Sequence, residues 1–341
     1  MDGQVRWAGV DLHKRMMSVC WLQENGKKQA ASYRLDGPGL EEFKKCLNPG
    51  MEVALEATGN SGHISDQIRD YVKAVRLINP RQFKVISDSV KKTDKNDAET
   101  IADYLSKGML PEIRQMSDEQ RQLRSLINTR DKLVKLRSAL KNKIHGIMNA
   151  QGIITEREMF SSEKALEKIK EASVGETARF EIGVIVEQIR SLGKTIKEID
   201  EKIKEQGKTL PGQKNLTSIT GIGELSSAII LNGIGDIKDF DDSKKLCAYA
   251  GMAPRVSNSS DTVHHGHITK RGNKILRTTI VQVTLISIKY NDYLKSFYLR
   301  LKQKKGSGKA IIATSRKMLE IIYNTLKNDW VFKNFNKYEL A

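Results

Sequence analysis

The feature that most constrains the fold is a long stretch without proline between Pro111 and Pro211. Its sequence is polar and charged, yet apolar residues recur with helical spacing. They repeat every seven positions at Leu126, Leu133, Leu140 and Ile147, and they follow a three-and-four step at Ile182, Ile185, Ile189, Leu192, Ile196, Ile199 and Ile203. The spacing predicts two long helices with a break at 151–175. The narrow seam favours packing against a partner helix, in the same chain or in a second subunit.

A chain of 341 residues is longer than one compact core usually needs. We expect three parts: an α/β domain at 1–110, a helical coiled-coil region at 111–208 and a mainly helical domain at 209–341. Lys and Arg number 58 against 41 Asp and Glu, which gives a net charge of +17. Such an excess predicts a polyanionic partner without distinguishing DNA from RNA.

Cysteine usage and hydropathy indicate the compartment. Cys20, Cys46 and Cys247 lie far apart and form no C-x-x-C pair, so the sequence supports neither a zinc knuckle nor a disulfide framework. No apolar stretch is long enough for a membrane span, and the first residues do not have the pattern of a signal peptide. We therefore expect a cytoplasmic protein with no membrane partner.

The first hundred residues alternate short apolar runs with amphipathic ones. Strands are predicted at 7–10, 16–22, 29–33, 52–55 and 74–78, with a hairpin turn at 24–26 and a helix at 61–72. The helix between the last two strands predicts a parallel βαβ unit. Three antiparallel strands followed by alternating helices and strands is the order of an RNase H-like sheet.

Four acidic residues fall at the ends of these predicted elements. Asp11 and Glu56 follow two strands, and Asp94 and Asp97 lie at the start of a helix, on one of its faces. Carboxylates are the ligands that Mg²⁺ prefers, and two such ions about 4 Å apart can stabilise both reacting oxygens of a phosphodiester. The alternative is structural: Asp94 caps the helix, Asp97 complements its dipole and Asp11 belongs to a turn.

The third region combines a candidate phosphate-binding turn with a polar loop. Gly221 and Gly223 are predicted to form the turn of a helix-hairpin-helix; the alternative is a turn that joins two helices and binds no ligand. A loop rich in serine and histidine follows, and its neighbouring cations could stabilise charge on phosphorus during attack by a serine. For its three histidines, His264, His265 and His267, proton transfer or phosphate binding is favoured over zinc. The candidate nucleic-acid contacts are Gly221, Gly223, Arg255, His267, Lys270, Arg271, Lys274 and Arg277.

Six segments together resemble the DEDD-type insertion-sequence transposases, which are bridge-RNA-guided recombinases. They are residues 9–14, 55–59, 92–98, 221–223, 250–255 and 267–273, in the same order as in that family. The resemblance implies a RuvC-like domain in which Asp11, Glu56, Asp94 and Asp97 hold Mg²⁺ or Mn²⁺. It also implies a C-terminal serine that attacks DNA.

The family's partners follow from the same resemblance. They are donor and target DNA, a noncoding bridge RNA that pairs with both, and further copies of the chain as a dimer or tetramer with a composite site. Localisation would be at the nucleoid. Family sequences usually place Ser-Gly five and six residues after the proline, where this chain has Ser259 and Ser260. Alignment on spacing selects Ser259 as nucleophile, with Ser260 in reserve.

Two other functions are compatible with the same residues. In a RuvC-type nuclease, water rather than serine attacks the phosphodiester. In a non-catalytic nucleic-acid-binding scaffold, the acidic residues only cap helices and offset basic charge. A further basic segment is predicted to be a turn between helices that contacts nucleic acid through charge alone; it contains Lys302, Lys304, Lys305 and Lys309.

Overall fold

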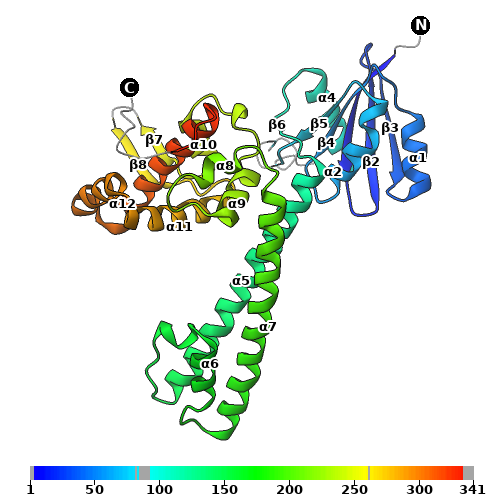
Figure 1. The fold of residues 1–341 in the computed structure, drawn as a ribbon. Helices are drawn as coiled ribbons and strands as arrows, with labels where there is room; N and C mark the ends of the chain where they lie inside the picture. The colour runs from blue at the N-terminus through cyan, green and yellow to red at the C-terminus, as the bar shows by residue number, and fades with distance from the viewer. Residues whose placement is uncertain (1–3, 81–82, 84–92, 260–261, 333–341) are drawn as a thin grey trace. The chain divides into compact units, whose positions relative to one another are not determined.

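A computed structural model describes residues 4–80, 83, 93–259 and 262–332. The chain forms two compact units, Met1–Asp118 and Glu119–Ala341. The first is a mixed α/β unit and the second is mainly helical, as predicted (Figure 1). Among the described residues, no helix combines the length and apolar character needed to cross a bilayer. The division into three domains stays a prediction.

A six-stranded mixed sheet forms the centre of the first unit, in the order β3-β2-β1-β4-β5-β6. Its strands are β1 Val5–Leu12, β2 Met16–Gln23, β3 Lys28–Arg34, β4 Glu52–Glu56, β5 Ala74–Ile78 and the short β6 Glu112–Ile113. β1, β2 and β3 pair antiparallel, β4 pairs parallel with β1 and β5, and β6 returns antiparallel. The five predicted strands are all present, and β6 was not predicted.

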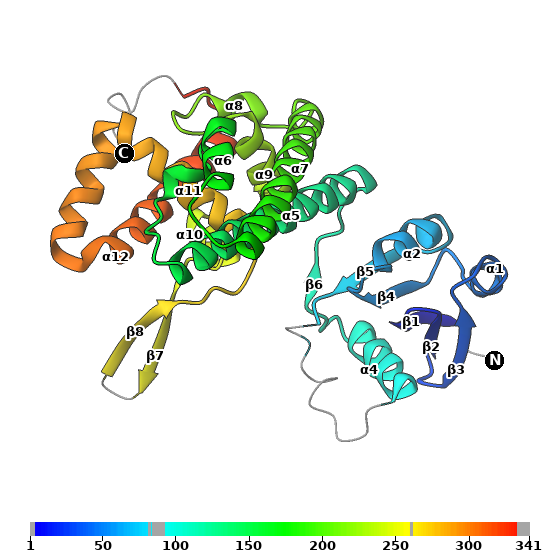
Figure 2. The ribbon, with the colours of Figure 1, turned by 90° about the horizontal axis from the view of Figure 1, so that it is seen from below.

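Helices cover both faces of this sheet because its central strands carry apolar residues on both sides. The helices are α1 Gly37–Lys45, α2 Ser61–Ile68, which is followed by a 3-10 turn, Arg69–Tyr71, and α4 Asp94–Ser106. Ala8 and Val10 of β1 belong to the core that α1 and α2 cover. Trp7 belongs to the core on the opposite face, beneath α4. Figure 2 shows the strands between α4 and the pair α1 and α2.

Gly9 allows α4 to lie directly on β1. A Cβ atom at this position would lie 2.2 Å from the carbonyl oxygen of Ala98 and 2.4 Å from the backbone nitrogen of Ala102. Both neighbours are backbone atoms of α4, so a side chain at Gly9 would require the helix to move away from the strand. The absence of a side chain at Gly9 therefore sets the distance between the end of β1 and the first turn of α4.

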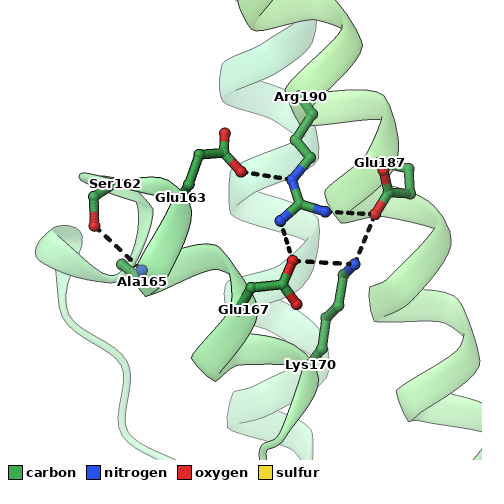
Figure 3. A network of polar contacts seen from close by, with 7 residues as sticks. All are labelled: Ser162, Glu163, Ala165, Glu167, Lys170, Glu187 and Arg190. Atoms are coloured by element: carbon green, nitrogen blue, oxygen red, sulfur yellow. Dashed lines mark hydrogen bonds and ion pairs between the residues drawn. The ribbon is translucent and has the colours of Figure 1, made fainter.

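Two long helices begin the second unit, α5 Asp118–Ala150 and α7 Glu176–Gly207, and they lie side by side in both views (Figures 1 and 2). Their bounds agree with the predicted break at 151–175. That break contains a 3-10 turn, Arg157–Phe160, and the short helix α6 Glu163–Lys170, which was not predicted. Arg190 of α7 forms ion pairs with Glu163 and Glu167 of α6, and Lys170 pairs with Glu187, so α6 is fastened to α7 (Figure 3).

The apolar seam of α7 packs within the chain. Ile182, Ile185 and Ile189 share a core with α5 and α6, and Ile203 shares another with α5 and α9. In α5 the fully buried positions are Leu123, Ile127, Ile144 and Met148. The predicted heptad residues Leu126, Leu133, Leu140 and Ile147 are only half buried. A continuous coiled-coil geometry stays a prediction.

The remaining helices enclose the largest apolar core of the second unit. They are α8 Gln213–Thr217, α9 Glu224–Ile234, α10 Ser243–Tyr249, α11 Lys274–Tyr290 and α12 Asp292–Lys327, with a 3-10 turn at Ile237–Asp239. α12 is kinked at Gly306, where φ is 75°. The predicted basic turn at Lys302 to Lys309 coincides with this kink, and all four of its lysines are exposed.

The serine-containing segment is not the loop that the sequence predicts. It forms a two-stranded antiparallel hairpin of β7 Pro254–Ser259 and β8 Thr262–Ile268. At its base, the amides of Thr269 and Lys270 donate to the carbonyl oxygens of Ala253 and Gly251. Backbone pairing stabilises this hairpin. Its strands were not predicted because their sequence is too polar to show the alternation of apolar residues by which strands are recognised.

We predict that Gly9→Ala lowers the free energy of unfolding by about 3 kcal/mol, because the added methyl group has no space against the α4 backbone. The measurement is chemical denaturation of the full chain followed by tryptophan fluorescence. Gly37→Ala, in the first turn of α1, is the matched control, since a Cβ there meets nothing within 4 Å. Equal stability of the two variants would contradict the close contact between β1 and α4.

Candidate active site

All four predicted acidic residues line one cavity of about 360 Å³ in the first unit. Asp11 lies near the end of β1, Glu56 ends β4, and Asp94 and Asp97 lie in the first turn of α4. β1 and β4 are parallel neighbours, so their carboxyl ends meet at the same edge of the sheet. Asp11 and Asp97 are buried, Glu56 is half buried and Asp94 is exposed.

Thr93, rather than Asp94, caps α4. Its side-chain oxygen accepts a hydrogen bond of 3.3 Å from the backbone amide of Asn96. The structural alternative for Asp94, that its carboxylate caps the helix, is therefore wrong. With the cap supplied by Thr93, the Asp94 carboxylate reaches toward the cavity instead.

His13 joins two of the acidic residues, and the sequence-based site did not include it. Its Nε2 atom lies 2.9 Å from Asp11 Oδ2 and 3.1 Å from Asp94 Oδ2. His13 follows β1, and its backbone amide donates to Met16 in the turn that leads to β2. Its position depends on this turn. The only sequence signal was its place two residues after Asp11, on the same side of an extended chain.

Without a cation, the cavity disfavours the charged form of the Asp11 carboxyl group. Burial raises the pKa of Asp11, His13 lowers it through its charge, and the carboxylates of Asp97 and Asp94 raise it further. The net direction is upward, which means that the charged form of Asp11 lacks full compensation within the protein.

The residues present fit a hard divalent cation. Carboxylate oxygens are the donors that Mg²⁺ and Mn²⁺ prefer. One atom each from Asp11, His13 and Asp94 lie within 4.8 Å of one another. A cation bound to the carboxylate oxygens would also supply the compensation that Asp11 lacks. A cation held by such donors can act as a Lewis acid.

The predicted nucleophile lies in the second unit. The backbone of Ser259 ends β7 and pairs with Thr262 of β8. The reserve residue Ser260 lies outside the described residues. The backbones of His264 and His265 lie in β8, opposite Ser257 and Val256. The hairpin thus carries Ser259 close to its turn, away from its base at Pro254 and Ile268.

The predicted nucleic-acid contacts divide into exposed and packed residues. Arg255, His267, Lys270, Arg271 and Lys274 are exposed at the hairpin or directly after it. Arg277 is half buried and donates from Nη1 to the carbonyl oxygen of Ala250 at 3.0 Å, which gives it a structural role.

The turn between α8 and α9 packs against α11. Gly221 has φ +100°, and a Cβ atom there would lie 2.3 Å from Ser287 Oγ. This close approach explains the glycine without a ligand. Gly223 precedes α9 as its N-cap residue. A helix-hairpin-helix that binds phosphate stays a prediction.

Two family profiles match the chain. The DEDD transposase family of IS110 elements matches residues 8–152, and the transposase IS116/IS110/IS902 family matches residues 213–299. The first match contains the whole cavity, and the second contains the serine hairpin.

Similar proteins match nearly the full length. The chain is 28% identical to the transposase for insertion sequence element IS1111A of Coxiella burnetii, over 96% of this chain and 92% of that protein. It is 23% identical to a probable family 20 transposase of Pseudomonas aeruginosa, over 95% and 98%. It is also 25% identical to the pilin gene-inverting protein of Moraxella bovis, over 96% and 97%.

We predict that Asp11→Asn raises the free energy of unfolding of the metal-free protein at neutral pH by about 1 kcal/mol, because it removes a buried charge that serves function rather than stability. The raised pKa of Asp11 means that its charged form opposes folding. The gain in free energy of unfolding is complete when the pH lies above the pKa of Asp11 in the folded state. It disappears when the pH falls below the pKa of Asp11 in the unfolded state, because the wild-type carboxyl group is then neutral in both states. Thermal unfolding in EDTA across this pH range is the measurement. A variant less stable than wild type at neutral pH would contradict this electrostatic account.

Proposed function

The chain belongs to the DEDD-type transposases of insertion sequences, and from this membership we propose how it cuts and rejoins DNA. We infer that Asp11, Glu56, Asp94 and Asp97 hold Mg²⁺, or Mn²⁺, and that Ser259 is the nucleophile. The observation that carries this proposal is the convergence of the four carboxylates on one cavity. Membership of a transposase family sets the non-catalytic scaffold aside.

A metal held by these carboxylates would supply positive charge next to a phosphoryl oxygen of the DNA and so stabilise the negative charge on the oxygens of the reacting phosphate. The residues of the cavity have separable roles. Asp11 and Asp97 are the buried ligands, fixed by β1 and α4. Asp94 and Glu56 are more accessible and complete the donor set. His13 orients the Asp11 and Asp94 carboxylates through its Nε2 contacts.

Ser259 acts on the same phosphodiester. Its Oγ atom attacks phosphorus, an oxygen–phosphorus bond forms, and the bond to one deoxyribose oxygen breaks, so that this oxygen leaves as a hydroxyl with the proton lost by serine. The resulting phosphoserine link conserves the energy of the phosphodiester, and a second DNA hydroxyl reverses the step on a new strand. The exposed Arg255, Lys270 and Arg271 near the hairpin offer charge to the DNA backbone.

The remaining features of the proposal concern fold and partners. We propose a RuvC-like first unit, a noncoding bridge RNA that selects donor and target DNA, and an oligomer in which the two halves of a composite site come from different subunits. The net charge of +17 supports a nucleic-acid partner, and the pilin gene-inverting relative supports strand rejoining as the outcome.

A second candidate function is a nuclease in which water attacks the phosphodiester. It is favoured by one observation: among the residues that the structure describes, those that line the acidic cavity all belong to the first compact unit. This unit alone carries the whole candidate metal site, and hydrolysis needs no residue from the hairpin.

We predict that replacing Ser259 and Ser260 together with alanine lowers the rate of strand joining by more than about 1000-fold and removes every covalent protein–DNA adduct. Recombination assays with labelled DNA, followed by denaturing gels, measure both. Ser257→Ala, in the same strand β7, is the matched control and keeps both activities. Asp11→Asn should abolish joining as well. Cleavage at the wild-type rate by the double serine variant, with no adduct from wild type, would favour the nuclease instead.

A further inference from the structure

Most of the net charge of the chain comes from one segment, and the proposed chemistry gives a role to only a few of its cations. Residues 262–319 contain 13 Lys and Arg and a single acidic residue, Asp292. This segment follows the turn of the serine hairpin and continues through α11 into α12 beyond its kink. Most of its cations are exposed. With so few acidic neighbours to pair with them, these cations favour a polyanionic partner.

One face of α11 is exposed along the whole helix. Its exposed positions recur at intervals of three and four, which places them on one side. They are Lys274, Thr278, Gln282, Leu285, Ile286, Lys289 and Tyr290. The opposite side is buried against α9 and α12. A helix of 17 residues spans about 25 Å, so this face is long enough to follow several nucleotides.

The end of this face carries exposed aromatic rings. Tyr290 is 72% exposed at the last position of α11, and Tyr293 is 42% exposed in the first turn of α12. Between them, the side chain of Asn291 caps α12 by accepting from the amide of Leu294 at 2.9 Å. This cap fixes the corner where the helix direction changes. Lys289, Lys295 and Arg300 lie within ten residues of Tyr290 and are exposed.

We propose that the exposed face of α11 and its corner with α12, here called the α11–α12 face, bind single-stranded nucleic acid. Unpaired bases stack on Tyr290 and Tyr293, while Lys274, Lys289 and Lys295 contact the phosphates. Exposed aromatic rings among cations are the combination that binds single strands, since every base offers a flat surface and every nucleotide offers a charge.

Two observations favour this ligand over other occupants. The excess of cations opposes a second copy of the same face, which would bring like charges together. Stacking on tyrosine requires bases that are already unstacked, so the rings add little to the binding of an intact duplex. The α11–α12 face starts at Lys274, directly after the exposed Lys270 and Arg271, so a bound strand would begin near the base of the hairpin that carries Ser259.

The inference does not depend on the serine or the metal. Binding is therefore measured in EDTA, where no cleavage occurs, by fluorescence anisotropy of the full chain with labelled 12-residue oligo(U), oligo(dT) and a DNA duplex at one fixed ionic strength. The double variant Tyr290→Ala, Tyr293→Ala should weaken single-strand binding by about tenfold or more and change duplex binding less than about twofold. The double variant with phenylalanine at both positions should retain wild-type affinity, because it retains the rings.

Phe180→Ala is the matched control, because Phe180 is 74% exposed on α7, far along the chain from this face. It should leave every affinity unchanged. Loss of affinity for either single strand supports the proposal, and the strand with the larger loss identifies the ligand as RNA or DNA. Wild-type affinity of the alanine double variant, or an equal loss for the duplex, would overturn it. A change in the oligomeric state of the alanine double variant, measured by light scattering, with unchanged affinity for nucleic acid would also overturn it. That result would assign the face to contact with a second copy of the chain.

Discussion

The contact of α4 with β1 at Gly9 is the constraint on which the acidic cavity depends. Backbone atoms of Ala98 and Ala102 lie where a side chain at Gly9 would be, so the helix and strand meet without an intervening layer. This contact carries the first turn of α4 to the carboxyl end of β1. Asp94 and Asp97 then share a cavity with Asp11, although more than eighty positions separate them in sequence.

The organisation of the two units separates the functions that the protein combines. The first unit assembles a cavity lined by four carboxylates, in which burial raises the pKa of Asp11. The second unit carries Ser259 on a polar hairpin and has exposed lysine and arginine side chains on α11 and α12. In the function that we propose, the first unit holds the metal, and the second unit supplies the attacking hydroxyl and charge for the DNA backbone.

The sequence predicts those parts of the fold and site that depend on periodicity and on strand ends. Apolar runs located all five main strands, and the proline-free stretch located α5 and α7. Asp11 and Glu56 meet because parallel neighbouring strands end at one edge. Other features depend on local geometry that leaves no periodic signal in the sequence. The turn between β1 and β2 places His13, and Thr93 rather than Asp94 is the N-cap residue of α4. Backbone pairing forms the hairpin that contains Ser259.

The central claim is that the cavity lined by Asp11, Glu56, Asp94 and Asp97 binds divalent cations during strand transfer. The most direct measurement is anomalous diffraction from crystals of the DNA-bound protein that contain Mn²⁺. We predict a manganese peak in this cavity, within bonding distance of Asp11 and Asp97 and next to the DNA phosphate that is to be transferred. A complex that positions DNA for cleavage, but shows no manganese in the cavity or shows it only elsewhere, would contradict the account.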